Sequence, residues 1–186
     1  MQQTTCQKEL QQLLADCIQN KRKAQHTLFK LFYSKAMGVC MRYANNSDEA
    51  QDMLNEGFLK VFANLKNYEH NGSFEAWIKK IMANTAIDYQ RKYKTLTQTI
   101  DIQNIKEIEY QSVEINEALS KIAIDELIEL IQKLPRISRT VFNLYIFEGY
   151  AHTEIAQMLN IKEGTSHWHL NFARNKLKEM IIQLTK

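Results

Sequence analysis

The chain has 186 residues, of which 45% are hydrophobic, and a formal net charge of +3 at neutral pH. This composition allows compact cores of moderate size in one or two domains and excludes disorder throughout. One proline and five glycines favour long helices joined by short loops, so we expect an all-α fold. No apolar run is long enough for a membrane span, and residues 1–20 lack the apolar stretch of a signal peptide. We therefore expect a cytoplasmic protein without membrane insertion.

The three cysteines, Cys6, Cys17 and Cys40, have neither CxxC nor histidine-rich spacing. This pattern indicates neither a disulfide framework nor a metal site, and we interpret the cysteines as small apolar residues. We expect no cofactor.

Helical spacing of apolar residues predicts a first long helix over residues 25–44, ended by Asn45-Asn46-Ser47. Ser47 is predicted to cap the next helix, which runs to about Leu65 and has carboxylates in its first turn. The apolar stripe of this helix leaves Asp52, Asn55 and Glu56 directed elsewhere.

A polar loop over residues 66–72 precedes Ser73, which is predicted to cap a helix over residues 74–93. Asn84, Asp88 and Arg91 lie along one edge of that helix. The periodicity then fades into an acidic, polar stretch typical of a linker. We therefore predict a first domain over residues 21–94, a linker over 95–119 and a second domain over 120–186.

The second domain begins with a predicted helix over residues 122–133, which stops at Leu134-Pro135. Ser138 is predicted to cap the next helix, which ends at Gly149. A helix-turn-helix pattern follows, with one helix over residues 153–159, a break at 160–164 and a second helix over residues 165–177. Such a unit lays its second helix in the DNA major groove.

The second helix of this pattern has one packed and one outward side. Ser166, Leu170, Ala173 and Leu177 recur at about 100° per residue and mark the packed side. Trp168, Asn171, Phe172 and Asn175 turn outward, with His167 and Arg174 on one flank and Thr165, His169 and Lys176 on the other.

Five motifs stand in an order that resembles one known family. They are residues 48–58, 74–78 and 84–91, Leu134-Pro135 and the terminal helix-turn-helix. The series is similar to the small bacterial sigma factors of the extracytoplasmic-function group, and it covers nearly all of the chain from about Gln25 onward. The resemblance implies two helical domains, sigma-2 and sigma-4, on a flexible linker. It also implies a promoter-specificity subunit that binds core RNA polymerase and promoter DNA, melts the DNA, and usually has an anti-sigma partner.

In this family the acidic helix binds the clamp helices of polymerase, and the matching positions are Asp52, Asn55 and Glu56. Asn55 stands where the family often has glutamine, so its reach is shorter. On spacing alone, the same carboxylates would also suit a solvated helix face. The acidic linker would suit the positively charged cleft that it threads in the family.

Residues 66–88 resemble the part that opens the promoter, where a flipped base of the minus-ten element is held by a loop. Tyr68, Asn71 and Gly72 are the matching loop residues, although an ordinary surface loop is the alternative. The matching helix would offer Asn84 and Asp88 to DNA and Lys79, Lys80 and Arg91 to phosphates. We expect Trp77 in the core.

For the minus-thirty-five element, the resemblance implies contacts from His167, Trp168, Asn171 and Phe172, with Thr165 on the flank. Lys162 and Arg174 are available for phosphates. Trp168 and Phe172 replace the small polar and arginine residues common there. They would pack either on thymine methyls and sugars, or against the sigma-2 domain or an inhibitor.

Two other functions compete with the sigma-factor hypothesis. A stand-alone helix-turn-helix regulator would need a dimer face and an effector pocket, which are not visible, and it leaves the acidic helix unexplained. An enzyme is disfavoured because His152 and Glu154 lack metal spacing and no glycine-rich phosphate loop exists. We expect no small-molecule substrate.

Overall fold

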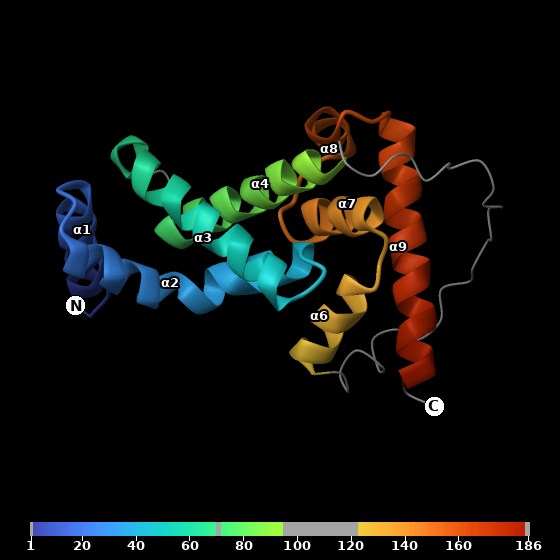
Figure 1. Ribbon diagram of the computed structural model, residues 1–186, viewed down its shortest axis with the longest axis horizontal. Coiled ribbons are helices and arrows are strands. Elements are labelled where there is room, and N and C mark those ends of the chain that lie inside the picture. The colour runs from blue at the N-terminus through green and yellow to red at the C-terminus, as the bar shows by residue number, and fades with distance from the viewer. Residues whose placement is uncertain (1, 70–71, 95–122, 185–186) are drawn as a thin grey trace.

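A computed structural model describes residues 2–69, 72–94 and 123–184, and all regular structure in these ranges is helical. The all-α prediction is confirmed. The helices form two groups that lie next to each other (Figure 1). The predicted linker and its acidic stretch lie outside the described residues.

The N-terminal group consists of α1 (Gln2–Ile18), α2 (Arg22–Tyr43), α3 (Ser47–Asn64), the short 3-10 turn η1 (Leu65–Asn67) and α4 (Phe74–Lys94). α2, α3 and α4 pack against one another around a core that includes Leu28, Met53 and Ile78, each at most 1% exposed. α1 packs on α2, and Leu14 and Cys17 join the same core. This core therefore extends upstream of residue 21, where we predicted the first domain to begin.

The helix caps in this group follow the sequence with one correction. Asn46, not Ser47, caps α3, because the Asn46 side chain accepts a hydrogen bond from the Glu49 amide at 2.8 Å. Ser47 already lies in the first turn. Ser73 caps α4 as predicted, since its Oγ accepts from the Ala76 amide at 3.1 Å.

The C-terminal group consists of α6 (Ile124–Gln132), α7 (Arg136–Ile146), α8 (His152–Leu159) and α9 (Glu163–Leu184). α6 and the C-terminal half of α9 share one apolar cluster, which contains Ile131 and Leu177. α7, α8 and the first half of α9 share another, which contains Leu144 and Leu170. α7 and α8 both pack on α9, so they hold the helix-turn-helix together.

The turn of the helix-turn-helix depends on Asn160, which ends α8 in the left-handed conformation at φ 52°. Asparagine tolerates this conformation better than most residues. Ala151 supplies no side-chain cap to α8, but Glu154 compensates by accepting from the Ala151 amide at 2.8 Å. α9 follows the turn with its predicted packed residues buried.

Ser138 does not cap α7, contrary to our prediction. The helix begins earlier, at Arg136, and Ser138 is buried inside it. Its Oγ lies 2.9 Å from Nδ1 of His169, which the sequence placed on a flank of α9 but which is only 5% exposed. The hydroxyl is therefore used between α7 and α9, where it bonds one ring nitrogen of a buried imidazole.

The two groups contact each other directly. α2 packs against both α6 and α7, and Ile87 of α4 is buried in the apolar cluster of α7, α8 and α9. The N-terminal group therefore contributes an apolar side chain to the core of the C-terminal group.

Candidate functional site

The outer face of α3 carries the residues that the sequence singled out for a protein partner. Asp52 and Asn55 are exposed, and Glu56 is half-buried. Met53, Leu54 and Phe58 on the opposite face are buried in the core. α3 is therefore anchored by its apolar stripe while Asp52 and Asn55 point to solvent.

Asn55 and Glu56 differ from Asp52 in their partners. Asn55 accepts a hydrogen bond from Gln51 at 3.0 Å, and Gln51 in turn accepts from the hydroxyl of Tyr33 at 3.3 Å. Glu56 pairs with Lys60 at 3.4 Å and with Lys92 at 3.5 Å. The Asp52 carboxylate forms no hydrogen bond or ion pair with any other described residue. The structure thus orients Asn55, draws Glu56 toward α4 and leaves the Asp52 carboxylate available.

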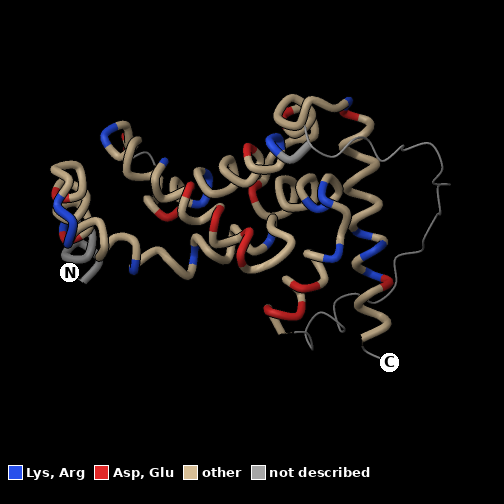
Figure 2. Tube along the Cα trace, viewed as in Figure 1, with Lys and Arg blue, Asp and Glu red and all other residues tan. Residues whose placement is uncertain are grey.

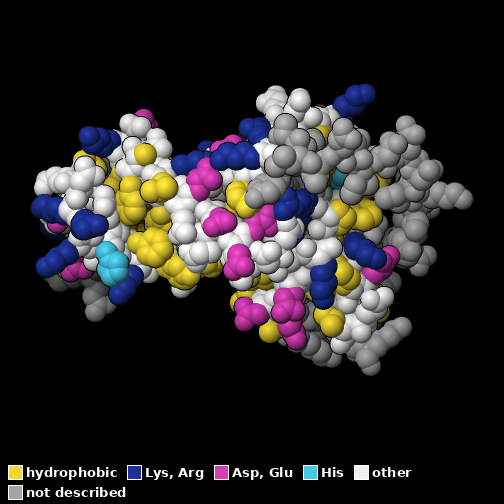
Figure 3. Space-filling view, viewed as in Figure 1, with side chains coloured by type: hydrophobic (Ala, Val, Ile, Leu, Met, Phe, Trp, Pro, Cys, Tyr) yellow, Lys and Arg dark blue, Asp and Glu magenta, His cyan; other side chains and the backbone are white. Residues whose placement is uncertain are grey.

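Apolar side chains flank this face, and the sequence reasoning missed them. Leu59 is 71% exposed, one turn after Asn55. The partly buried ring of Phe29 on α2 contacts the buried ring of Phe58 on α3, with their centroids 4.6 Å apart. Figure 3 shows hydrophobic side chains gathered over these two helices. An exposed leucine among charged residues on the outer side of an amphipathic helix was the signal available for finding this surface.

Tyr68 lies at the start of the loop predicted to hold a flipped base. Its ring packs against Phe74 at 5.0 Å and Trp77 at 5.3 Å, and its hydroxyl donates to the Gly72 carbonyl at 3.0 Å. Trp77 packs on the core, as expected. Asn71 lies outside the described residues. The loop is thus anchored at one end by a group of three aromatic rings.

The basic residues at the start of α4 are not equivalent. Lys79 pairs with Glu75 at 2.7 Å, and Lys35 of α2 bonds to the same carboxylate. Hydrogen bonds from Lys35 and Lys79 lower the pKa of Glu75. Lys80 is exposed and has no partner among the described residues. Of the two predicted phosphate-binding lysines, Lys80 is therefore the one that is not neutralised.

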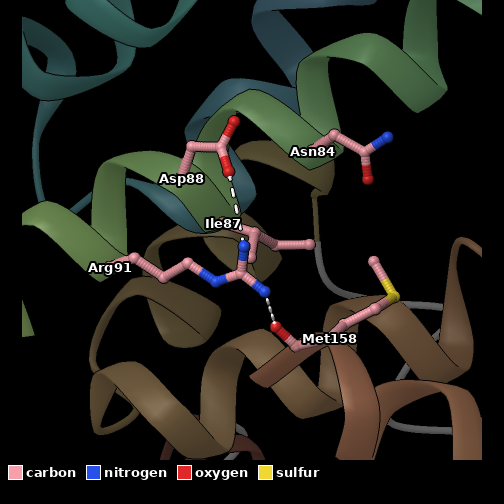
Figure 4. A pocket seen from close by; sticks show the side chains of 5 residues that line it. All are labelled: Asn84, Ile87, Asp88, Arg91 and Met158. Carbon is pink, nitrogen blue, oxygen red and sulfur yellow. Dashed lines mark hydrogen bonds and ion pairs between the residues drawn. The ribbon is translucent and has the colours of Figure 1, made fainter. Parts of the chain in front are cut away.

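Asn84, Asp88 and Arg91 line one side of an open pocket of about 350 Å³ together with Ile87. Figure 4 shows all four on α4, with Met158 of α8 facing them. Asp88 pairs with Lys60 at 2.9 Å and with Arg91 at 3.7 Å. The Arg91 guanidinium also donates to the Met158 carbonyl. The structure thus brings Asn84, Asp88 and Arg91, the predicted minus-ten residues of α4, together. Their side of α4 faces α8 of the helix-turn-helix.

The first turns of α9 present the residues predicted for the minus-thirty-five element. Trp168 and Phe172 stack with ring centroids 5.3 Å apart and an interplanar angle of 19°. Both are partly exposed, and neither belongs to an apolar cluster of the described residues. Asn171 and Arg174 are exposed on the same helix, as is Lys162 just before it, whereas Thr165 is half-buried. The lysine and arginine positions of α9 lie beyond these first turns (Figure 2).

The ring of His167 is the end member of a column of three stacked rings, which also contains His152 and Tyr145. His152 of α8 lies between the rings of His167, at 3.7 Å, and of Tyr145, at 4.6 Å. Nδ1 of His152 lies 2.8 Å from Ser166 Oγ. Burial lowers the pKa of His152, and the neighbouring His167 lowers it further. Sequence reasoning missed this column, because its members come from three helices.

Two family models match the chain in the order of these sites. Sigma-70 region 2 matches residues 28–95 and sigma-70 region 4 matches residues 124–177, together about two thirds of the chain. The first match contains most of α2 and all of α3, and the second contains α8 and most of α9, the two helices of the helix-turn-helix. This chain belongs to the sigma-70 family of RNA polymerase sigma factors. As a sigma factor it directs promoter recognition by RNA polymerase.

Relatives of this sigma factor carry the name of the extracytoplasmic-function (ECF) group. The ECF RNA polymerase sigma factor SigW of Bacillus subtilis is 26% identical, covering 83% of this chain and 87% of its own. The RNA polymerase sigma-H factor of Pseudomonas aeruginosa is 25% identical, covering 97% of both chains. The predicted membership of the ECF group is confirmed, and a stand-alone helix-turn-helix regulator would leave the region 2 match unexplained.

A solved structure supports the fold. The sigma factor RpoE of Bartonella quintana, in complex with the anti-sigma factor NepR, matches with a TM-score of 0.50 and 17% identity. The match covers 87% of this chain and 98% of that one. Within the described residues of this sigma factor, no helix is both long and apolar enough to cross a membrane.

Proposed function

We propose that this sigma factor binds core RNA polymerase through the outer face of α3, with Asp52 as its central charge. The observation that carries the proposal is that Asp52 is exposed and that its carboxylate forms no hydrogen bond or ion pair with another described residue. Both of its oxygens are therefore available for a bidentate arginine of a partner. Asn55 and the 71% exposed Leu59 extend the same face along the helix.

The proposal assigns the minus-ten element to α4 and the loop before it. Lys80, which has no ion-pair partner among the described residues, would bind a phosphate. Lys79 and Arg91 would bind phosphates after breaking their ion pairs with Glu75 and Asp88. Asn84 and Asp88 would contact bases, and Tyr68 and Asn71 would hold the base that leaves the stack.

The minus-thirty-five element is assigned to the first turns of α9. The stacked rings of Trp168 and Phe172 offer an apolar surface for thymine methyls or sugars, with His167 and Asn171 beside them. Thr165 lies on the flank, and Lys162 and Arg174 would bind phosphates.

We further propose that the protein has no catalytic activity of its own, works in the cytoplasm beside polymerase, and is held by an anti-sigma factor. The family acts in initiation without catalysing a reaction. The Bartonella RpoE, which shares the fold, was solved with the anti-sigma factor NepR.

Run-off transcription with purified core polymerase tests the α3 interface. Charge reversal in Asp52→Lys should lower the yield of transcript at limiting sigma factor at least about tenfold, since like charges that face each other at an interface cost several kcal/mol. Glu9→Lys on α1 makes the same change of charge at an exposed position and should have no effect. Circular dichroism should show both variants folded. Unchanged transcript with Asp52→Lys would remove Asp52 from the interface.

A further inference from the structure

We infer that His152 is a positioning residue for the minus-thirty-five element, and that it acts by fixing the ring of His167 on the outward side of α9. The inference rests on the proposed assignment of His167 to that element. It adds a buried residue of α8 that does not touch DNA but affects which base pair the recognition helix accepts.

The two imidazole rings differ in exposure, which gives them different roles. His152 is the first residue of α8 and is only 8% exposed. The side chain of His167 is 57% exposed and stacks on it, with ring centroids 3.7 Å apart and an interplanar angle of 30°. His167 can therefore meet a base edge, whereas His152 acts on DNA only through the ring that covers it.

His152 is itself held on its other face and at one edge. Tyr145 of α7 stacks on it, with ring centroids 4.6 Å apart and an interplanar angle of 25°. Nδ1 of His152 lies 2.8 Å from Oγ of Ser166, which is fully buried in α9. These contacts fix the plane of the His152 ring relative to α7 and α9, so the ring forms a rigid platform under His167.

The support of His167 comes from another helix rather than from α9. Glu163 and Asn171, which stand four residues before and after His167, have no ring that could stack on it. The carboxylate of Glu163 lies 3.8 Å from Nε2 of His167, and its side chain is exposed. Trp168 differs, because its ring stacks on Phe172 of the same helix. The orientation of the His167 ring therefore depends on α8.

An ordered ring is an advantage for reading a base. The χ2 torsion of histidine is broad, so an unsupported ring on a helix surface presents its nitrogens in many directions. Immobilising such a side chain at an interface opposes binding, and a side chain that is already ordered avoids this cost. The stack orders His167 before DNA is bound, which favours a directed hydrogen bond from one ring nitrogen to one base edge.

The charges around His152 keep the platform neutral. Burial lowers the pKa of His152 below its ordinary value of 6.5, and the neighbouring His167 lowers it further. Of the other charged groups of α9 that face it, Arg174 acts in the same direction and Glu163 in the opposite one. The inner ring is therefore uncharged at neutral pH, and it stacks on His167 without repelling it in either charge state of His167.

Promoter binding by the holoenzyme tests the inference, on fragments in which each base pair of the minus-thirty-five element is replaced in turn. His167→Ala identifies the base pair that His167 reads, since replacement there should no longer weaken binding. In the wild type, one replaced base pair should weaken binding by about 5- to 150-fold. His152→Leu, which fills the space without a flat ring, should reduce this effect to about threefold or less at the same base pair only.

A conservative variant separates positioning from packing. His152→Phe keeps a flat ring between Tyr145 and His167 and should retain the discrimination of the wild type. Combining His152→Leu with His167→Ala should cause no greater loss than His167→Ala alone, because both act through one contact. Ile155→Val is the matched control, since it removes a methyl group from the apolar cluster of the helix-turn-helix rather than from the stack. It should leave discrimination unchanged at every base pair.

Circular dichroism should show each variant folded, and His152→Ala takes the place of His152→Leu if leucine is not tolerated. Full discrimination at the base pair read by His167 would overturn the inference alone. It would also be overturned by an equal loss at every base pair, or by the same loss in His152→Phe, because either result would indicate a structural role. If His167→Ala changes discrimination at no base pair, the assignment of His167 in the proposed function is wrong and the inference falls with it.

Discussion

The imidazole rings of His152 and His167 stack with their centroids 3.7 Å apart and connect α8 to the recognition helix α9. Tyr145 packs on the other face of His152, and the Arg174 guanidinium lies 5.7 Å from the Tyr145 ring centroid. The charged groups near His152 are therefore Arg174, His167 and Glu163, of which only Glu163 favours its protonation. Two stacked imidazoles do not readily carry two charges.

Stability should consequently depend on the protonation of His152. Its pKa lies below the ordinary value of 6.5 in the folded chain, mainly because the ring is buried. The unfolded chain then binds more protons between the lowered pKa and 6.5, so the free energy of unfolding rises with pH in this window. The contribution is complete above 6.5 and is lost as the pH falls toward the pKa of the folded state.

Urea unfolding at about pH 7.5 and about pH 5.5 measures this effect. His152→Phe keeps an aromatic ring in the column and removes the titration, so the loss of stability at the lower pH should be smaller than in the wild type. His26→Gln, at an exposed position of α2, should keep the pH dependence of the wild type. The same dependence in His152→Phe would mean that another group is responsible.

The close approach of α3 and α4 at Gly57 makes a second prediction. A Cβ at Gly57 would lie 2.3 Å from Sδ of Met82, which is fully buried. Gly57→Ala should therefore destabilise the chain by about 1–3 kcal/mol through overpacking, reduced by the ~0.5–1 kcal/mol that alanine gains in a helix.

Denaturant titrations of a double-mutant cycle check this prediction. Met82→Ala alone should cost about 2–5 kcal/mol, and the combination with Gly57→Ala should cost less than the sum, because the new methyl occupies vacated space. Gly38→Ala on α2 is the matched control, since a Cβ there meets nothing within 4 Å and should stabilise the chain. Strict additivity of Gly57→Ala and Met82→Ala would show that the two positions do not interact.

The stacked pair Trp168 and Phe172 should contribute to binding of the minus-thirty-five element. Each alanine substitution should weaken binding of the polymerase holoenzyme to a promoter with that element by about 1–3 kcal/mol, or ~5- to 150-fold. Because the rings support each other, the double substitution should cost less than the sum.

A promoter in which the minus-thirty-five element is scrambled is the control for this measurement. On it, Trp168→Ala should make little difference. An equal loss on both promoters would indicate that the rings support the fold or bind a protein rather than reading DNA.

Lys80 should contribute one phosphate contact. Lys80→Gln should make the plot of log K against log salt shallower by about 0.9 for a duplex phosphate, or about 0.7 for a single strand. The measurement is promoter binding by the holoenzyme over a range of salt concentrations. Lys8→Gln on α1 removes the same charge at another exposed position and should leave the slope unchanged. Equal slopes for Lys80→Gln and the wild type would exclude this contact.

The local elements were largely predictable from sequence, because their causes are local. Ser73 caps α4 and Trp77 packs on the core, as predicted. One error was a shift of one residue, at the Asn46 cap of α3. The other arose where a polar side chain has a distant partner. Ser138 looked like a helix cap because its partner, His169, is 31 residues away.

In the proposed sites, too, features with local causes were predictable from sequence, and contacts between helices were not. Helical spacing placed Asp52 on the solvent side of α3, but it could not reveal that Glu56 is drawn toward Lys92. This pairing depends on which neighbour that face of the helix meets.

By itself the sequence determined an all-helical chain, the helix-turn-helix and the order of motifs that belongs to sigma factors, because helical periodicity, caps and turn residues act within a few positions. Only the tertiary structure decided that Arg139 is buried between the two groups, that Arg91 bonds to α8, and that His152 lies beneath His167. These relationships join residues dozens of positions or different helices apart, and they result from packing and desolvation, which no local pattern records.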